Sequence, residues 1–196
     1  MRSSFLLIGC MAVLLAIAIA ACTNSSANTA NAPAKADSAA RVLRGAYLVN
    51  AIGCDDCHSP KRMGAHGPEI IPELRLSGFP HDGKLPPINT DEVKKGWAML
   101  SPDLTSAVGP WGISYAGNLT SDATGIGNWK EENFIRALRE GKFKGLPNGR
   151  SLLPPMPWYN FAKLTDEDLK AMFAYLKTTK PVKNTVPAPK PLDELH

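Results

Sequence analysis

Apolar residues form an unbroken run near the amino end of the chain, from residue 5 to residue 21. Arg2 places a positive charge before this run, which is typical of an export signal, and the flanks of a stable membrane span are missing. We therefore expect residues 1–21 to be a signal peptide. Residues 22–38 are small and polar without an apolar period, which predicts a flexible tether.

Three later segments repeat apolar residues at helical spacing, at about 39–52, 129–140 and 166–177. Gly53 follows the first, where a helix would stop. Asn128 is the expected cap of the second helix, and Thr165 that of the third. The third has a clear apolar stripe, formed by Leu169, Met172, Phe173 and Leu176.

Proline and glycine interrupt residues 60–128 so often that only one short helix, at about 91–99, is expected there. The rest reads as a long ordered loop, which in compact domains usually carries function or wraps a cofactor. The tail, 181–196, contains four prolines and should be extended on the surface or free. The fold class predicted is all-α, with one domain over residues 39–180.

The overall composition fits this reading, since 196 residues with 44% apolar content suit one globular domain. The net charge of +4 is scattered, and no run of Lys or Arg is long enough to follow a phosphate backbone. Nucleic acid is therefore not an expected partner.

The sequence indicates a role for each of the four cysteines. Cys10 leaves with the signal peptide, and Cys22 follows Ile19-Ala20-Ala21, a stretch that resembles the lipobox of bacterial lipoproteins. Cys22 would then be the lipid-bearing first residue, whereas a plain secretory signal cut nearby would leave it an odd thiol. Cys54 and Cys57 remain, so no cysteine is left for a disulfide with another part of the chain.

Cys54-Asp55-Asp56-Cys57-His58 is the C-x-x-C-H pattern of covalent haem attachment. Two thiols three residues apart can each bond one haem vinyl group, and the adjacent histidine then ligates the iron. A zinc site would need two more ligands, for which only His66 and His81 are near. A redox dithiol would need a βαβ setting, which the pattern does not provide.

Three stretches of the chain resemble class I cytochromes c, and more narrowly bacterial exported mono-haem cytochromes and the cytochrome subunits of membrane dehydrogenases. They are GAYLVNAIGCDDCHSP, GPWGISYAGNLTSDATGIGNWKEENFIRALREGK and LLPPMPWYNFAKLTDEDLKAMFAYLK. The resemblance implies an all-helical shell around one haem c, with a long loop insertion between the haem motif and the axial methionine. It also implies that the first and last helices cross, with Gly45 allowing close approach and Tyr175 or Leu176 filling the crossing.

Four methionines after the signal are candidates for the sixth iron ligand: Met63, Met99, Met156 and Met172. Met172 lies on the apolar stripe of the last helix, so we expect it in the core. Met156 stands among prolines that fix the chain, and it matches the family's methionine position. We therefore predict His58 and Met156 as the axial pair, with Met99, Met63, His81 or His66 as alternatives.

Further side chains are expected around the haem. The resemblance implies that a proline carbonyl, Pro68 or Pro60, accepts the Nδ1–H of the haem histidine, which would orient the ring. Asn118 would lie near the haem edge or form a turn. Aromatic residues expected to wall the haem are Trp111, Trp129, Trp158 and Tyr159.

With both axial positions filled, only the oxidation state of the iron can change, so the sequence predicts a single-electron carrier and no enzyme. Its expected partners are redox proteins, such as a dehydrogenase, other cytochromes or an oxidase, and a membrane through the lipid on Cys22. Its expected location is the periplasm. Two alternatives stay open. One is an open-site haem enzyme or gas sensor, with His81 or Arg150 facing the iron, and the other is a binding module with a structural haem.

Lipidation at Cys22 can be tested directly. Mass spectrometry of the native protein should show a lipid-modified Cys22 as residue one, because the lipobox directs both acylation and cleavage. A free amino terminus beyond Cys22 would contradict this expectation.

Overall fold

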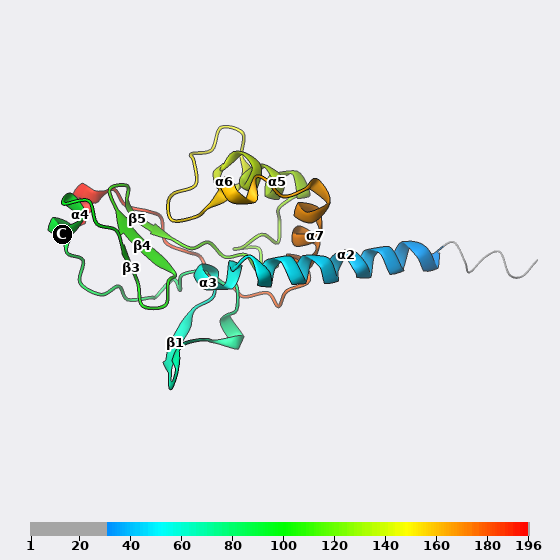
Figure 1. Ribbon diagram of the computed structural model, residues 1–196, viewed down its shortest axis with the longest axis horizontal. Helices are drawn as coiled ribbons and strands as arrows, with labels where there is room; N and C mark the ends of the chain where they lie inside the picture. Colours follow the sequence, from blue (N-terminus) through cyan, green and yellow to red (C-terminus); the bar gives the residue numbers. More distant parts are fainter. Residues whose placement is uncertain (1–30, 196) are drawn as a thin grey trace, which may run out of the picture. The chain divides into compact units, whose positions relative to one another are not determined.

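The computed structural model describes residues 31–195 of the chain, so the predicted signal peptide and Cys22 lie outside the described residues (Figure 1). Residues 41–195 make one compact unit, and residues 31–40 belong to a separate one. Within residues 31–195, no helix is both long and apolar enough to cross a membrane.

The four predicted helices are present, with shifted ends: α2 (Asn31–Ala51), α4 (Thr90–Lys94), α5 (Glu131–Glu140) and α7 (Asp166–Leu176). Two further short helices were not predicted, α3 (Cys54–His58) and α6 (Trp158–Phe161). The Thr165 hydroxyl accepts a hydrogen bond from the Asp168 N–H, which confirms the predicted cap of α7. Helix α5 is capped differently from the prediction, because Lys130 and not Asn128 precedes its first turn. The Asn133 side chain accepts the Lys130 N–H there.

A single apolar core joins α2, α5 and α7. It contains Leu48, Val49, Leu76, Ile126, Phe134, Leu138, Leu169, Met172, Phe173 and Leu176. Helix α5 packs against both α6 and α7 (Figure 1). The Arg139 side chain of α5 adds a polar link, since it donates to the Leu164 carbonyl and pairs with Asp166 at 2.5 Å.

Helices α2 and α7 approach closely at Gly45, as the family resemblance implies. A Cβ atom added there would meet the Ala171 carbonyl oxygen and the Cβ of Tyr175. Glycine is thus required at this position by space and not by backbone conformation. An exposed ion pair between Arg44 and Asp168, at 2.9 Å, lies beside this contact.

The all-α fold class is wrong, because the segment expected to be loop contains two small antiparallel sheets. One pairs β1 (Lys61–Gly64) with β2 (Gly67–Ile70), and the other has the order β3 (Met99–Leu100), β4 (Ser106–Gly109), β5 (Gly112–Tyr115). The predicted helix at 91–99 is limited to α4, and Met99 begins β3. Four-residue strands are too short to show a period of two, and the glycines that predicted loop lie where the hairpins turn.

The tail from residue 181 is extended as predicted, apart from a short 3-10 helix (Leu192–Glu194), but it is fixed in place. Ile113 of β5 donates its N–H to the Lys190 carbonyl, and the buried Asn184 side chain donates to the carbonyls of Ser77 and Phe79. The tail is therefore part of the folded unit.

The contact at Gly45 generates a stability prediction. Gly45→Ala should lower the free energy of unfolding by about 2 kcal/mol, because the cost of overpacking exceeds the gain in helix propensity. Chemical denaturation of the haem-loaded protein measures this change. Leu43→Ala is the matched control on α2, since Leu43 is 71% exposed, and it should change stability by less than about 0.5 kcal/mol.

Candidate haem site

The C-x-x-C-H segment forms the short helix α3, entered through Gly53 in the left-handed conformation with φ 76°. Cys54 and Cys57 are three residues apart on this helix, so they share one face, and both are partly buried. His58 ends the helix with 9% of its surface exposed. A single helical turn thus presents two thiols and an imidazole side by side.

The His58 ring is oriented by a hydrogen bond from Nδ1 to the Gly117 carbonyl oxygen, at 2.7 Å. A carbonyl can only accept, so Nδ1 carries the proton and Nε2 keeps its lone pair. Burial lowers the pKa of His58, which favours the neutral ring. His58 is therefore held in the tautomer and charge state that a metal ligand needs.

The acceptor is not the proline carbonyl that the family resemblance implied. The Pro60 carbonyl accepts the Ile71 N–H, and Pro68 lies exposed in β2, where it pairs with Met63. Sequence reasoning missed Gly117 because it lies 59 residues from His58, beyond the reach of any local pattern.

The two thiols have raised pKa values. Burial, with the nearby charges of Asp55 and Asp56, raises the pKa of Cys54 to about 12, and burial also raises that of Cys57. A redox dithiol requires the opposite, a lowered thiol pKa. Within residues 31–195, no cluster of three or more His, Cys, Asp or Glu side chains is arranged to hold a metal ion.

A charged network fixes α3 to the rest of the unit. The Arg75 guanidinium donates two bonds to one Asp55 carboxylate oxygen, at 2.6 and 3.2 Å, and one to the Tyr175 hydroxyl on α7, at 2.7 Å. It also donates to the Asn50 side chain on α2. Asp55 further accepts from the fully buried Ser59 hydroxyl at 2.6 Å. One arginine therefore connects the cysteine-bearing helix with both crossing helices.

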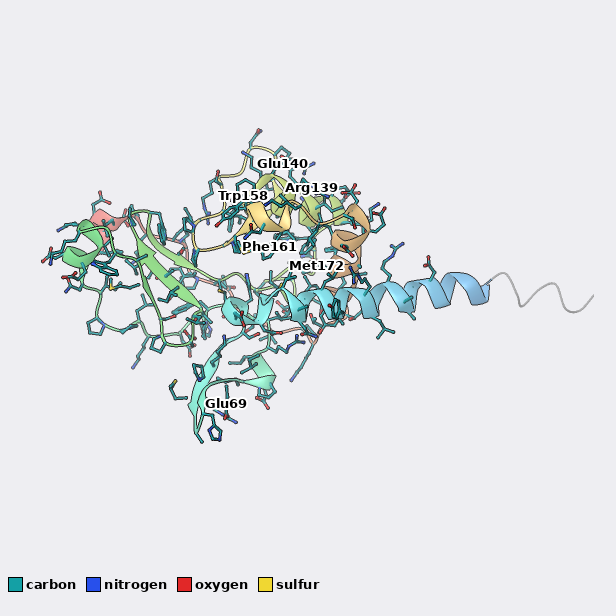
Figure 2. The ribbon with its side chains drawn as sticks, viewed as in Figure 1. Glu69, Arg139, Glu140, Trp158, Phe161 and Met172 are labelled. Carbon is teal, nitrogen blue, oxygen red and sulfur yellow. The ribbon has the colours of Figure 1, made fainter. Side chains whose placement is uncertain are left out.

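The candidate sulfur ligands lie in different surroundings. Met172 is 2% exposed within the core, as predicted, and it is labelled on α7 in Figure 2. Met63 is 71% exposed on β1, and Met99 packs with Val93, Val108 and Ile113 in a separate apolar cluster. Met156 is half-buried and packs against the main core, as Cys54 does.

The aromatic residues expected around the haem do not all gather there. Trp129 packs against the main core, and the Trp158 ring on α6 lies where a Cβ on Gly141 would be. Tyr159 is 60% exposed. Trp111 belongs to the β4–β5 hairpin, where its indole N–H donates to Ser114.

The polar candidates either make structural contacts or lie exposed at the surface. Asn118 forms a turn, since its side-chain oxygen accepts from Thr120, and its amide donates to the Val182 carbonyl of the tail. His66 is exposed, and the His81 side chain is 68% exposed beside Asp82. The Arg150 guanidinium stacks over the Phe143 ring at 4.0 Å.

The cytochrome c family model matches residues 42–180, the segment that contains α3, its Gly117 partner and the core. The chain belongs to the cytochrome c family. This assignment confirms the predicted resemblance and the prediction of an electron-transfer protein with haem c as its cofactor. The arrangement of residues 54–58 fits that group, because two free thiols lie beside a neutral imidazole whose Nε2 lone pair is available.

Several curated relatives are similar to this chain. It is 34% identical over 137 residues to the gluconate 2-dehydrogenase cytochrome c subunit of Pantoea cypripedii, covering 69% of this chain and 22% of the relative. It is 34% identical over 151 residues to the fructose dehydrogenase cytochrome subunit of Gluconobacter japonicus, covering 76% of this chain and 23% of the relative. The cytochrome c subunit of the quinone-dependent alcohol dehydrogenase of Gluconobacter oxydans is 32% identical over 145 residues, covering 73% of this chain and 22% of the relative. The chain thus spans less than a quarter of the length of these relatives.

The Arg75 network generates a second stability prediction. Arg75→Met should lower the free energy of unfolding by about 2 kcal/mol, because it leaves a half-buried carboxylate without its main partner. Arg44→Met removes an ion pair whose arginine side chain is 52% exposed and should cost less than about 1 kcal/mol. Denaturant titration compares the two variants, and equal losses would show that the Arg75 network is no stronger than a surface ion pair.

Proposed function

We propose that this chain is an exported single-electron carrier, with one haem covalently bound at Cys54 and Cys57 and ligated by His58 and Met156. The observation that carries the proposal is the His58 ring, which Gly117 orients and burial keeps neutral, beside two free thiols. The sequence of 196 residues contains one C-x-x-C-H motif, which supports one haem.

The surroundings of Met156 support its role as the second axial ligand. It packs against the same core as Cys54, and three prolines at positions 154, 155 and 157 restrict the chain around it. The Met156 N–H donates to the Leu153 carbonyl at 3.3 Å, which closes a turn. Met99 and Met63 lie in other surroundings, and Met172 is committed to the core.

Bound haem would supply a reversible one-electron couple, and His58 and Met156 would be the two ligands that close the iron to other reactants. His58 would donate its Nε2 lone pair while Gly117 holds the opposite edge of the ring. Met156 would contribute a thioether, which favours a high reduction potential. The two cysteines would retain the cofactor outside the cytoplasm, where a diffusible group would be lost.

We infer the partner from the relatives and the location from the residues near the amino end. The relatives are named as cytochrome subunits of dehydrogenases for gluconate, fructose and alcohol, so we infer that the donor is a membrane dehydrogenase. The acceptor would be another cytochrome or an oxidase. We further infer a periplasmic location and a lipid anchor at Cys22, supported by the apolar run before it and the lipobox-like residues 19–22.

The axial methionine is tested by Met156→Ala. The ferric protein should lose the weak charge-transfer band that a thioether ligand gives at the red end of the visible spectrum. Its reduction potential should fall, and its ferrous form should bind carbon monoxide, because the iron gains an open position.

Met172→Ala is the matched control. It should keep the band and mainly lose packing, about 2 to 5 kcal/mol of stability. Retention of the band in Met156→Ala would move the ligand to Met99 or Met63. Absence of the band from the unmodified protein would overturn methionine ligation, and carbon monoxide binding by that protein would favour an open-site enzyme or sensor.

A further inference from the structure

The Lys61 side chain has an unusual set of partners. Its ammonium lies within hydrogen-bond distance of four backbone carbonyl oxygens: Asp55 at 3.1 Å, Asp56 at 2.7 Å, Ser59 at 2.9 Å and Asp103 at 3.1 Å. The first three belong to the last turn of α3 and the residue after it. Carbonyls at a helix end lack partners within the helix, and a cation there is favourable.

The fourth carbonyl belongs to a distant segment that is itself well fixed. The Asp103 carboxylate accepts from the Ser101 hydroxyl at 2.7 Å and from the Thr105 hydroxyl at 2.8 Å. Thr105 is fully buried. The carboxylate therefore closes its own turn, which leaves the Asp103 carbonyl directed at Lys61.

This turn leads to the partner of the haem histidine. The Thr105 carbonyl accepts the Ala116 N–H at 2.8 Å, and the next residue, Gly117, offers its carbonyl to His58. Strands β4 and β5 connect the same two points through the chain. A closed circuit thus runs from the end of α3 through Lys61, Asp103, Thr105 and Gly117 back to α3.

The positive charge of Lys61 interacts with carbonyl oxygens and not with a carboxylate. Within the described residues its ammonium makes no ion pair, and the carboxylate of Asp55, on the neighbouring helix α3, is bound by Arg75. An apolar side chain of similar length would leave the four carbonyls without this donor. The end of α3 and the Asp103 turn would then lose the link that Lys61 makes between them.

We propose that Lys61 is a positioning residue for the haem histidine: it fastens the 101–117 segment to α3 and thereby holds the Gly117 carbonyl against His58 Nδ1. This inference rests on the proposed role of His58 as an iron ligand. It also assigns a function to the three-stranded sheet, whose last strand ends two residues before Gly117, the acceptor of the histidine proton.

The test is proton exchange in the ferrous, haem-loaded full chain, followed by nuclear magnetic resonance. Lys61→Met should speed the exchange of the His58 Nδ1 proton with solvent about tenfold, because the Gly117 carbonyl is held less firmly. The Leu169 amide in the core of α7 is the internal reference and should change less than about twofold.

Arg62→Met is the matched control, since it removes one positive charge from the next residue of β1, which is exposed. It should leave the His58 proton unchanged. Thr105→Val keeps Lys61 but removes a hydrogen bond to the Asp103 carboxylate. It should therefore also speed the exchange of the His58 Nδ1 proton. This variant replaces Lys61→Met in the test if Lys61→Met does not fold.

An unchanged His58 proton in Lys61→Met, or an equal acceleration at Leu169, would overturn the positioning role. A different measurement would contradict the proposed function. A spectrum of the unmodified protein without a Met156 methyl shifted by the haem ring would reject methionine ligation while leaving the His58 measurement valid.

Discussion

The hydrogen bond from His58 to the Gly117 carbonyl, 2.7 Å long, is the interaction on which the site depends. It fixes the proton on Nδ1, and burial keeps the ring neutral by lowering its pKa. Much of the remaining architecture serves to keep its two ends in place. Arg75 ties α3 to the crossing helices on one side, and the strands β4 and β5 deliver the carbonyl on the other.

The charged residues around α3 differ in the kind of partner that each one has. Asp55 is neutralised by Arg75, whereas Lys61 is surrounded by carbonyl oxygens. The carboxylates help to keep the Cys54 thiol protonated by raising its pKa, after the larger effect of burial. A helix of five residues with two acidic side chains is thus stabilised by two basic residues that come from outside it.

Local patterns predicted those features that depend on neighbours in sequence. The C-x-x-C-H motif, the Thr165 cap and the core position of Met172 are all of this kind. The Gly45 contact also agreed, but through family resemblance and not from the local pattern. What the sequence could not show depends on long-range contacts, such as the Gly117 carbonyl and the two sheets that overturned the all-α prediction. A four-residue strand becomes stable only through its partner, so its own residues carry little information.

The fixed tail limits the order in which the contacts of the folded unit can form. Asn184 joins the carbonyls of Ser77 and Phe79, and the Asn118 amide, adjacent to Gly117, donates to Val182. These links close loops of more than a hundred and of about sixty residues, and such closures carry a large entropic cost. During synthesis the thiols and the histidine emerge well before residue 184. The links from Asn118 to Val182 and from Asn184 to Ser77 can therefore form only after Cys54, Cys57 and His58 have been made.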